Sequence, residues 1–232
     1  METEEIRRLA AKSAFRLVVT AAVMVATLLV AAGTVHWPAA WACAGLWAAM
    51  TATGVFFMLR INPELAVERM QGRTGTKGWD KLLMPLLALI LPLAILVVAG
   101  LDARFGWTGT FPPWPRWIGA VLMLSGYGLG VWAMASNPFF SAVVRIQTDR
   151  GHRVADGGPY AVVRHPGYVG AFGVNIGPPL ILGSVWALTV VAVLLALFVL
   201  RTALEDRTLH AELEGYADYA ARVRWRLFPG LW

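Results

Sequence analysis

Apolar residues fill most of this chain in long runs that short polar segments separate. Four of these runs cover residues 14–32, 39–59, 82–101 and 117–135. Each is about as long as an α-helix must be to cross the hydrocarbon core of a bilayer. After Pro166 a shorter apolar segment ends at a turn, and a fifth long run extends from Val185 past Leu200. The pattern predicts an all-α, polytopic membrane helical bundle of five full spans, with a short helical arm that forms a hairpin with the last span.

Proline and glycine positions refine this topology. Pro85 and Pro92 predict a kink in the third span. Gly126 and Gly130 in the fourth span have the spacing that favours close contact between helices. The polar segment between the second and third spans predicts a helical turn or two at Glu64–Met70, and the charged residues before the first span predict a short amphipathic or frayed head.

The composition supports a membrane protein and excludes an ordinary soluble domain, because 58% of the residues are hydrophobic, 15% are charged and the mean hydropathy is +0.60. With the N-terminus inside, 18 of the 20 Lys and Arg residues fall on one side, leaving Arg104 and Arg116 on the other. Cytoplasmic loops are rich in Lys and Arg, so we expect cytosolic termini. The net charge of +6 does not indicate nucleic-acid binding, because the basic residues lie between the apolar runs, near lipid headgroups.

The segment Gly151–Gly170 is suited to hold a ligand, because it places two histidines, two arginines and paired glycines among the apolar runs. Paired glycines allow a turn or the close approach of a ligand to the backbone. Pro166 predicts the start of a helix. Arg164 and His165 therefore stand at a helix N-terminus, where free N–H groups and the helix dipole favour an anion.

A second polar cluster follows the last span. Arg201, Glu205 and Leu209 are four residues apart and share one helix face, whereas Asp206 points roughly 100° away. Arg201 and Glu205 form either a surface ion pair of little energetic value or a functional pair, since acids just inside a membrane are costly without a partner. No group of His, Cys or acidic residues has ligand spacing, so the sequence predicts no metal site.

An ordered set of short motifs runs from the polar segment to the C-terminus. It comprises Gly151-His152-x-Val154, Gly158-Pro159-Tyr160, Val163-Arg164-His165-Pro166-x-Tyr168-x-Gly170, Leu182-Gly183-Ser184, Arg201 before Glu205-Asp206-x-x-Leu209, Gly215-Tyr216-x-x-Tyr219 and Leu227-x-Pro229-Gly230. In this order and spacing the set resembles the isoprenylcysteine carboxyl methyltransferase family over residues 137–232. The acidic pair, usually two glutamates in that family, is Glu205 and Asp206 here.

The resemblance implies methyl transfer from S-adenosylmethionine, leaving S-adenosylhomocysteine, to a lipophilic acceptor that enters from the lipid bilayer. The acceptor it suggests is the carboxylate of a prenylcysteine-like or other amphiphilic acid, prenylated proteins included. We expect a single integral membrane domain over 1–232, in which 1–135 form a four-span bundle and 136–232 form the cofactor-binding and catalytic part with a cytosolic pocket.

The resemblance also implies roles for individual residues. Candidate cofactor-binding residues are His152, Val154, Gly158, Tyr160, Arg164, His165, Tyr168, Glu205 and Asp206. Arg164 or His165 suits the donor's carboxylate, Glu205 suits its ammonium, and aromatic rings suit its adenine. Arg201 and Glu205 are the candidate catalytic residues, with Arg201 orienting an acceptor carboxylate. Candidate acceptor-binding residues are Asn137, Phe140 and Arg201, although an Asn-Pro pair at this position also simply ends a helix.

Three alternatives remain open from the sequence. Methylation of a phospholipid amine would need a base, for which Glu205, Asp206 and His165 are the options. An NADPH-dependent reductase of the sterol type shares a related C-terminal architecture but has more spans. A scaffold or transporter without catalytic activity is disfavoured, because the apolar runs contain almost no charged residues along which a solute could pass.

Overall fold

The computed structural model describes residues 3–61 and 75–232, and within these ranges all of its regular secondary structure is helical. Its elements are α1 (Thr3–Ala32), α2 (Pro38–Ile61), α4 (Asp80–Pro85), the π-helical turn η1 (Leu86–Ile90), α5 (Leu91–Phe105), α6 (Trp114–Ser136), the 3-10 turns η2 (Thr148–Arg150) and η3 (Gly158–Ala161), α7 (Pro166–Leu182), α8 (Val185–Glu212) and α9 (Tyr216–Arg222). The predicted all-α class is confirmed. The turn predicted at Glu64–Met70 lies outside the described residues.

Within the described ranges, four helices are long and apolar enough to cross a membrane, which agrees with a membrane protein. They are Pro38–Phe57, Asp80–Phe105, Trp114–Ser136 and Val185–Glu212. The first predicted span corresponds to α1, whose apolar part, Val18–Ala32, is shorter. The helix itself begins at Thr3, so the predicted head continues directly into the span. Five crossings remain a prediction, as does the side of the membrane on which the termini lie.

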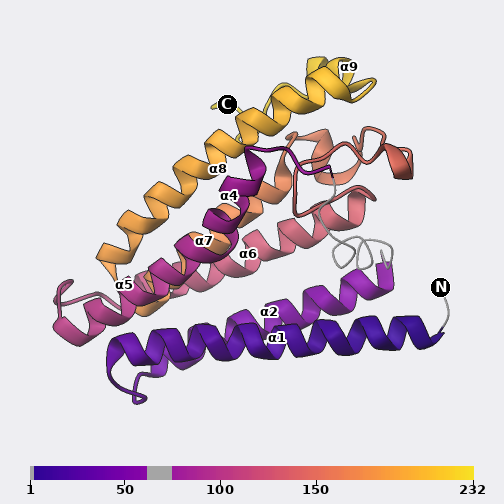
Figure 1. Cartoon of the computed structure of the whole chain (residues 1–232). Helices are drawn as coiled ribbons and strands as arrows, with labels where there is room; N and C mark the ends of the chain where they lie inside the picture. The colour runs from indigo at the N-terminus through magenta and orange to yellow at the C-terminus, as the bar shows by residue number, and fades with distance from the viewer. Residues whose placement is uncertain (1–2, 62–74) are drawn as a thin grey trace.

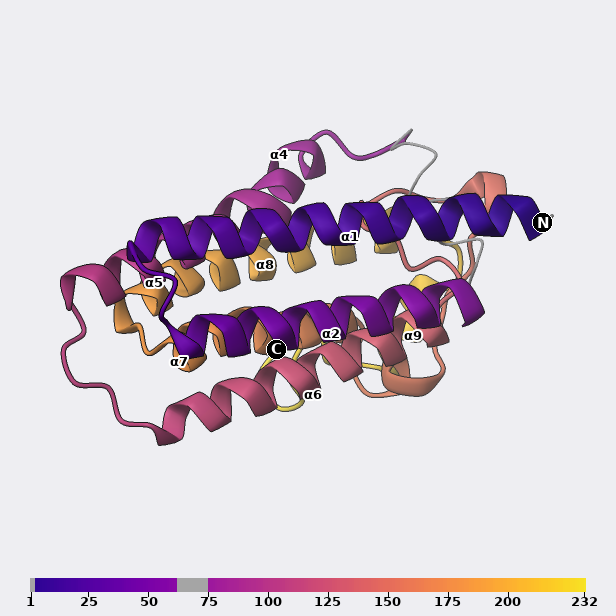
Figure 2. The ribbon, with the colours of Figure 1, turned by 90° about the horizontal axis from the view of Figure 1, so that it is seen from below.

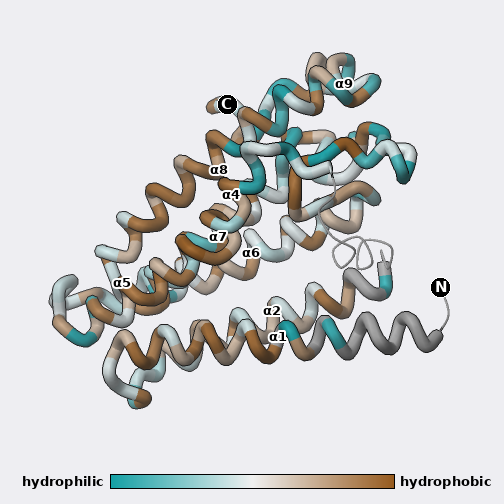
Figure 3. The backbone as a smooth tube through the Cα atoms, viewed as in Figure 1, coloured by the Kyte–Doolittle hydropathy of each residue, from teal (hydrophilic) through white to brown (hydrophobic). Residues whose placement is uncertain are grey.

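The helices run roughly along one direction, with α1 and α2 side by side as one hairpin (Figures 1 and 2). Helix α5 packs on α1 and on α8, and α6 packs on α7. The N-terminus of α1, the end of α2, the segment after α6, and α9 all lie at one end of the bundle. Hydrophilic residues gather at this end, around α9 and the segment that precedes α7 (Figure 3).

Glycines bring α6 and α7 into backbone contact. A Cβ added to Gly126 would lie 2.4 Å from the carbonyl oxygen of Gly170, and one added to Gly173 would lie 2.4 Å from that of Leu122. Only glycine permits such an approach without moving the backbone. The close contact predicted for Gly126 is confirmed, whereas a Cβ on Gly130 would meet nothing within 4 Å.

The third span is irregular where its prolines lie. Pro85 ends α4, the π-helical turn η1 follows, and Pro92 stands in the first turn of α5. A proline lacks the N–H that the regular ladder uses, and a π turn accommodates the mismatch. The predicted kink therefore takes the form of a local change in helix type.

The C-terminal tail holds the residues that enter α7. The backbone N–H of Arg164 donates to the carbonyl of Trp225 at 2.9 Å, and that of His165 donates to Arg226 at 3.0 Å. Helix α7 then ends at Gly183, which has φ of 77°, and Ser184 caps α8 by accepting the N–H of Ala187 at 3.0 Å. The predicted short arm is thus a 17-residue helix.

Candidate active site

A cavity of about 280 Å³ opens at the polar end of the bundle, between the segment 137–165, the start of α7, α8 and α9. Most of the residues singled out from the sequence line it. These are Asn137, Phe140, His152, Val154, Tyr160, Arg164, His165, Tyr168, Arg201 and Glu205. Gly158 and Asp206 are not part of this lining. The hairpin and the segment before it therefore meet as the motif spacing predicts.

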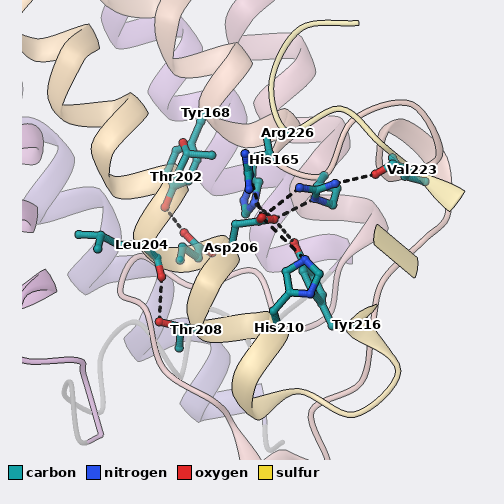
Figure 4. A network of polar contacts seen from close by, with 12 residues as sticks. His165, Tyr168, Thr202, Leu204, Asp206, Thr208, His210, Tyr216, Val223 and Arg226 are labelled. Carbon is teal, nitrogen blue, oxygen red and sulfur yellow. Dashed lines mark hydrogen bonds and ion pairs between the residues drawn. The ribbon is translucent and has the colours of Figure 1, made fainter. Parts of the chain in front are cut away.

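Asp206 lies at the centre of a cluster with the buried Arg164, His165 and Tyr216 and the partly exposed Arg226 (Figure 4). Its Oδ1 accepts from Arg164 Nε and from the Tyr216 hydroxyl, both at 2.8 Å, and lies 3.2 Å from His165 Nε2. Its Oδ2 accepts from Arg226 Nε at 2.8 Å and from Arg164 Nη2 at 3.0 Å. We call these five residues the Asp206 cluster.

The Asp206 cluster bears on the roles expected for two cofactor-binding candidates. Asp206 is 1% exposed and fully engaged, so it joins α8 to the start of α7 and to the tail instead of reaching the cavity. All three guanidinium nitrogens of Arg164 also donate, with Nη1 directed at the carbonyls of Val223 and Arg224. Arg164 still lines the cavity, and its role toward the donor's carboxylate stays a prediction.

Gly158 also serves the fold. Its φ is +58°, and a Cβ there would lie 2.4 Å from Ser136 Oγ, so the position requires glycine to turn the chain against the end of α6. Its neighbour Tyr160 is buried, and burial raises the pKa of its phenol. The Tyr160 hydroxyl accepts from Asn137 Nδ2 at 3.3 Å. Asn137 is the residue after the end of α6 and also lines the cavity, so both of its expected roles are compatible.

Arg201 pairs with an acid that the sequence did not suggest. Its Nε donates to Asp80 Oδ1 at 2.7 Å, and its Nη2 donates to Asp80 Oδ2 at 3.2 Å and to the carbonyl of Ala142 at 2.9 Å. Its Nη1 makes no hydrogen bond with any residue that the structure describes. The alternative of a surface ion pair between Arg201 and Glu205 is therefore wrong.

Tyr168 stands between the two charges of the cavity. The Arg201 guanidinium carbon lies 5.3 Å from the centre of the Tyr168 ring, within the range of a cation–π contact. The Tyr168 hydroxyl donates to Glu205 Oε2. Within ranges 3–61 and 75–232 this is the one hydrogen bond of the Glu205 carboxylate, so its Oε1 is open to a ligand.

His152 forms an aromatic wall of the cavity. Its ring lies 4.7 Å from that of Phe139, and its Nδ1 accepts the N–H of Gln147 at 3.3 Å. Burial, and then the charges of Arg145 and Arg150, lower the pKa of His152 to about 4. The ring is therefore neutral near pH 7, where it can offer an uncharged face for stacking. No group of three or more metal-ligating side chains occurs in the described part of the chain.

The comparison with known families covers this site. A sequence model of the isoprenylcysteine carboxyl methyltransferase (ICMT) family matches residues 118–211. Residues 118–211, which we call the ICMT segment, are thus similar to this family. The ICMT segment contains most of α6, the whole wall formed by 137–165, α7 and nearly all of α8, so Arg201 and Glu205 both lie within it. A search among curated proteins finds no match to the chain.

The residues that sequence reasoning missed come mostly from outside the ICMT segment. Asp80 lies in the third span, and Tyr216 and Arg226 lie after the matched residues. Tyr216 was visible as part of a motif. Asp80 lies in the first turn of a helix, where the helix dipole stabilises an acidic residue even without a partner, so its presence there indicates no pairing. The sequence thus held no separate signal for the Arg201–Asp80 pair.

Proposed function

We propose that this protein is a membrane methyltransferase, which transfers a methyl group from S-adenosylmethionine to the carboxylate of a prenylcysteine-like or other amphiphilic acid. One observation carries the proposal. Within the ICMT segment, a single cavity presents an open guanidinium nitrogen, Arg201 Nη1, and an open carboxylate oxygen, Glu205 Oε1. A cation for the acceptor and an anion for the donor are what this transfer requires.

The residues present fit the donor. Glu205 offers a carboxylate to the donor's ammonium, and the faces of Tyr168 and His152 suit an adenine or a sulfonium. Arg153 also lines the cavity and makes no hydrogen bond with the described residues, so it joins Arg164 as a candidate for the donor's carboxylate. The volume of about 280 Å³ is close to the lower limit of ~300 Å³ for small-molecule sites.

The residues of this chain act mainly by positioning. When bound, S-adenosylmethionine supplies an activated methyl group, so the protein need not provide a nucleophile. A carboxylate acceptor is ionised near neutral pH and needs no base, which leaves orientation and exclusion of water as the protein's tasks. Arg201 Nη1 orients the acceptor, while Tyr168 and Phe198 form the apolar wall beside it.

An apolar groove next to the cavity suits the rest of such an acceptor. It has a volume of about 370 Å³ and lies between α2, α6 and α7. Phe140, Gly167 and Ala171 line both the groove and the cavity, so the two adjoin. We propose that the hydrocarbon part of the acceptor reaches the cavity along this groove, and that 1–135 serve as the supporting bundle for the catalytic part at 136–232.

Incubation of the purified protein with methyl-deuterated S-adenosylmethionine and a bacterial lipid extract, followed by mass spectrometry, tests the reaction. We expect a deuterated methyl ester that mild base hydrolyses. A label that survives base and resides on a phospholipid amine would favour the amine alternative. The absence of any transfer, together with tight binding of NADPH, would contradict the proposal.

A further inference from the structure

Asp80 is a buried acid to which the proposed reaction gives no direct role. Its side chain is 0% exposed and lies at the start of α4, 121 residues before Arg201 in the sequence. Besides two bonds from Arg201, Asp80 Oδ2 accepts the backbone N–H of Val144 at 2.7 Å. Arg201 in turn donates a hydrogen bond to the carbonyl of Ala142. The pair therefore joins α4, α8 and the segment that walls the cavity.

Helix spacing alone favours a different partner for Arg201. Glu205 is four residues further along α8, a separation at which an arginine and a glutamate readily pair. Such a pair would neutralise both open atoms of the cavity. Instead, two bonds hold the Arg201 guanidinium against Asp80, and the Tyr168 ring lies beneath it with its hydroxyl on Glu205.

We propose that Asp80 is a positioning residue, which keeps Arg201 from pairing with Glu205 and leaves Nη1 free for the acceptor's carboxylate. This inference rests on the proposed function, because it takes Arg201 as the site of that carboxylate. Since Asp80 balances the charge of Arg201 while occupying only Nε and Nη2, the arginine stays in the protein interior without using Nη1.

Loss of the Asp80 charge removes this restraint. In Asp80→Asn the guanidinium lacks its counter-ion, and the nearest remaining acid along α8 is Glu205. The cation then turns toward Glu205, and the acceptor loses its anchor. An uncharged acceptor analogue does not use that anchor, so its binding is unaffected.

Equilibrium binding of cis-parinaric acid, a fluorescent fatty acid, and of its methyl ester to the detergent-purified protein measures the anchor without any turnover. We expect the wild type to bind the acid more tightly than the ester. Asp80→Asn should weaken binding of the acid about tenfold, equivalent to ~1.4 kcal/mol, and leave the ester unchanged. Asp80→Glu, which keeps the charge, should restore the preference.

A double-mutant comparison separates positioning from a purely structural role. In a Glu205→Gln background the competing carboxylate is gone, so adding Asp80→Asn should lower the affinity for cis-parinaric acid by less than about threefold. Asp102→Asn is the matched control, because Asp102 is also buried but lies at the other end of the bundle. It should leave the ratio of acid to ester affinity unchanged.

Several results would overturn the inference. The first is that Asp80→Asn binds cis-parinaric acid as tightly as the wild type. The second is that it loses affinity for the acid and the ester equally. The third is that it loses the same affinity for the acid whether or not Glu205 is present. Failure of Asp80→Glu to recover the preference would also overturn it, even if Asp80→Asn could not be purified. By contrast, a wild type that binds acid and ester equally would contradict the proposed carboxylate acceptor itself.

Discussion

The two ends of the helical bundle bury carboxylates in different ways. At the end away from the cavity, Asp102 accepts from the backbone N–H of Thr108 at 2.7 Å and from the hydroxyls of Thr108 and Ser184, each at 2.5 Å. All of these donors are neutral. At the cavity end, Asp206 is held mainly by Arg164 and Arg226, and the Asp80 carboxylate is held by an arginine as well.

The difference shows what charge contributes at each end. Neutral donors satisfy Asp102 and tie the loop after α5 to the turn between α7 and α8. Arginines at the other end bring several donors each, so they satisfy the buried acids and still fix the walls of a cavity. The acids at the cavity end therefore fix the positions of arginine side chains, whereas Asp102 fixes only the loop and turn that contact it.

Removal of the charge on Asp206 should give the largest effect. Asp206→Asn leaves the buried Arg164 without its partner, and loss of one member of a buried ion pair costs ~3–5 kcal/mol of unfolding free energy. Thermal unfolding in detergent measures it. Asp156→Asn is the control, because the exposed Asp156–Arg222 pair should contribute under ~1 kcal/mol. Similar melting of the two variants would contradict the importance of the cluster.

The corresponding change at the other end should be smaller and purely structural. Asp102→Asn retains one carbonyl acceptor but cannot satisfy all three donors, which should cost ~1–3 kcal/mol. Thermal unfolding gives the loss, and a titration with S-adenosylhomocysteine should show donor affinity equal to that of the wild type. A weakened donor affinity would mean that the two ends of the bundle are coupled, which would contradict the purely structural role of Asp102.

The groove can be tested with two glycines of α6. A Cβ on either Gly128 or Gly130 would meet nothing within 4 Å, but only Gly130 lines the groove. Gly130→Leu should raise the KM for a lipophilic acceptor roughly tenfold, or ~1.4 kcal/mol, with donor affinity unchanged. Gly128→Leu should behave like the wild type in the same steady-state assay. Equal effects at both positions would remove the groove from the acceptor's path.

The smallest expected effect is a pH dependence from His152. Its pKa is about 4 in the folded protein against 6.5 for an unperturbed histidine. Between these values the unfolded chain binds a proton that the folded one does not, so stability falls as the pH is lowered through that window. The melting temperature should therefore fall less between pH 7 and pH 5 in His152→Gln than in the wild type. Parallel decreases would exclude this contribution.

Much of the fold follows from the sequence, because apolar runs of membrane length leave a chain few alternatives to helices. The boundaries follow less closely. Helix α1 begins at Thr3, well before its apolar run, and the two prolines of the third span produced a π turn that periodicity does not indicate. The spacing of Gly126 and Gly130 predicted close helix contact at both positions. A Cβ on Gly126 would meet α7, whereas one on Gly130 would enter open space, and spacing alone does not distinguish the two.

The candidate site was predictable where the signal was local. The resemblance to the family, which the order of the motifs carries, implied that His165, Tyr168, Arg201 and Glu205 share one pocket, and all four line the cavity. The ~100° offset placed Asp206 on a different helix face from Glu205, but neither its burial nor its partners were predicted. Asp80 and Arg226 reach the site from distant segments, and no local pattern distinguishes them from ordinary helix-end and tail charges.

A calorimetric titration of the purified protein with S-adenosylhomocysteine tests the central claim most directly. We expect saturable binding to the wild type and binding weakened about tenfold or more, ~1.4 kcal/mol, in Glu205→Gln, which loses the charge facing the donor's ammonium. Arg201→Lys should keep the wild-type affinity, because Arg201 serves the acceptor. No binding to the wild type, or tight binding of NADPH in its place, would contradict the account.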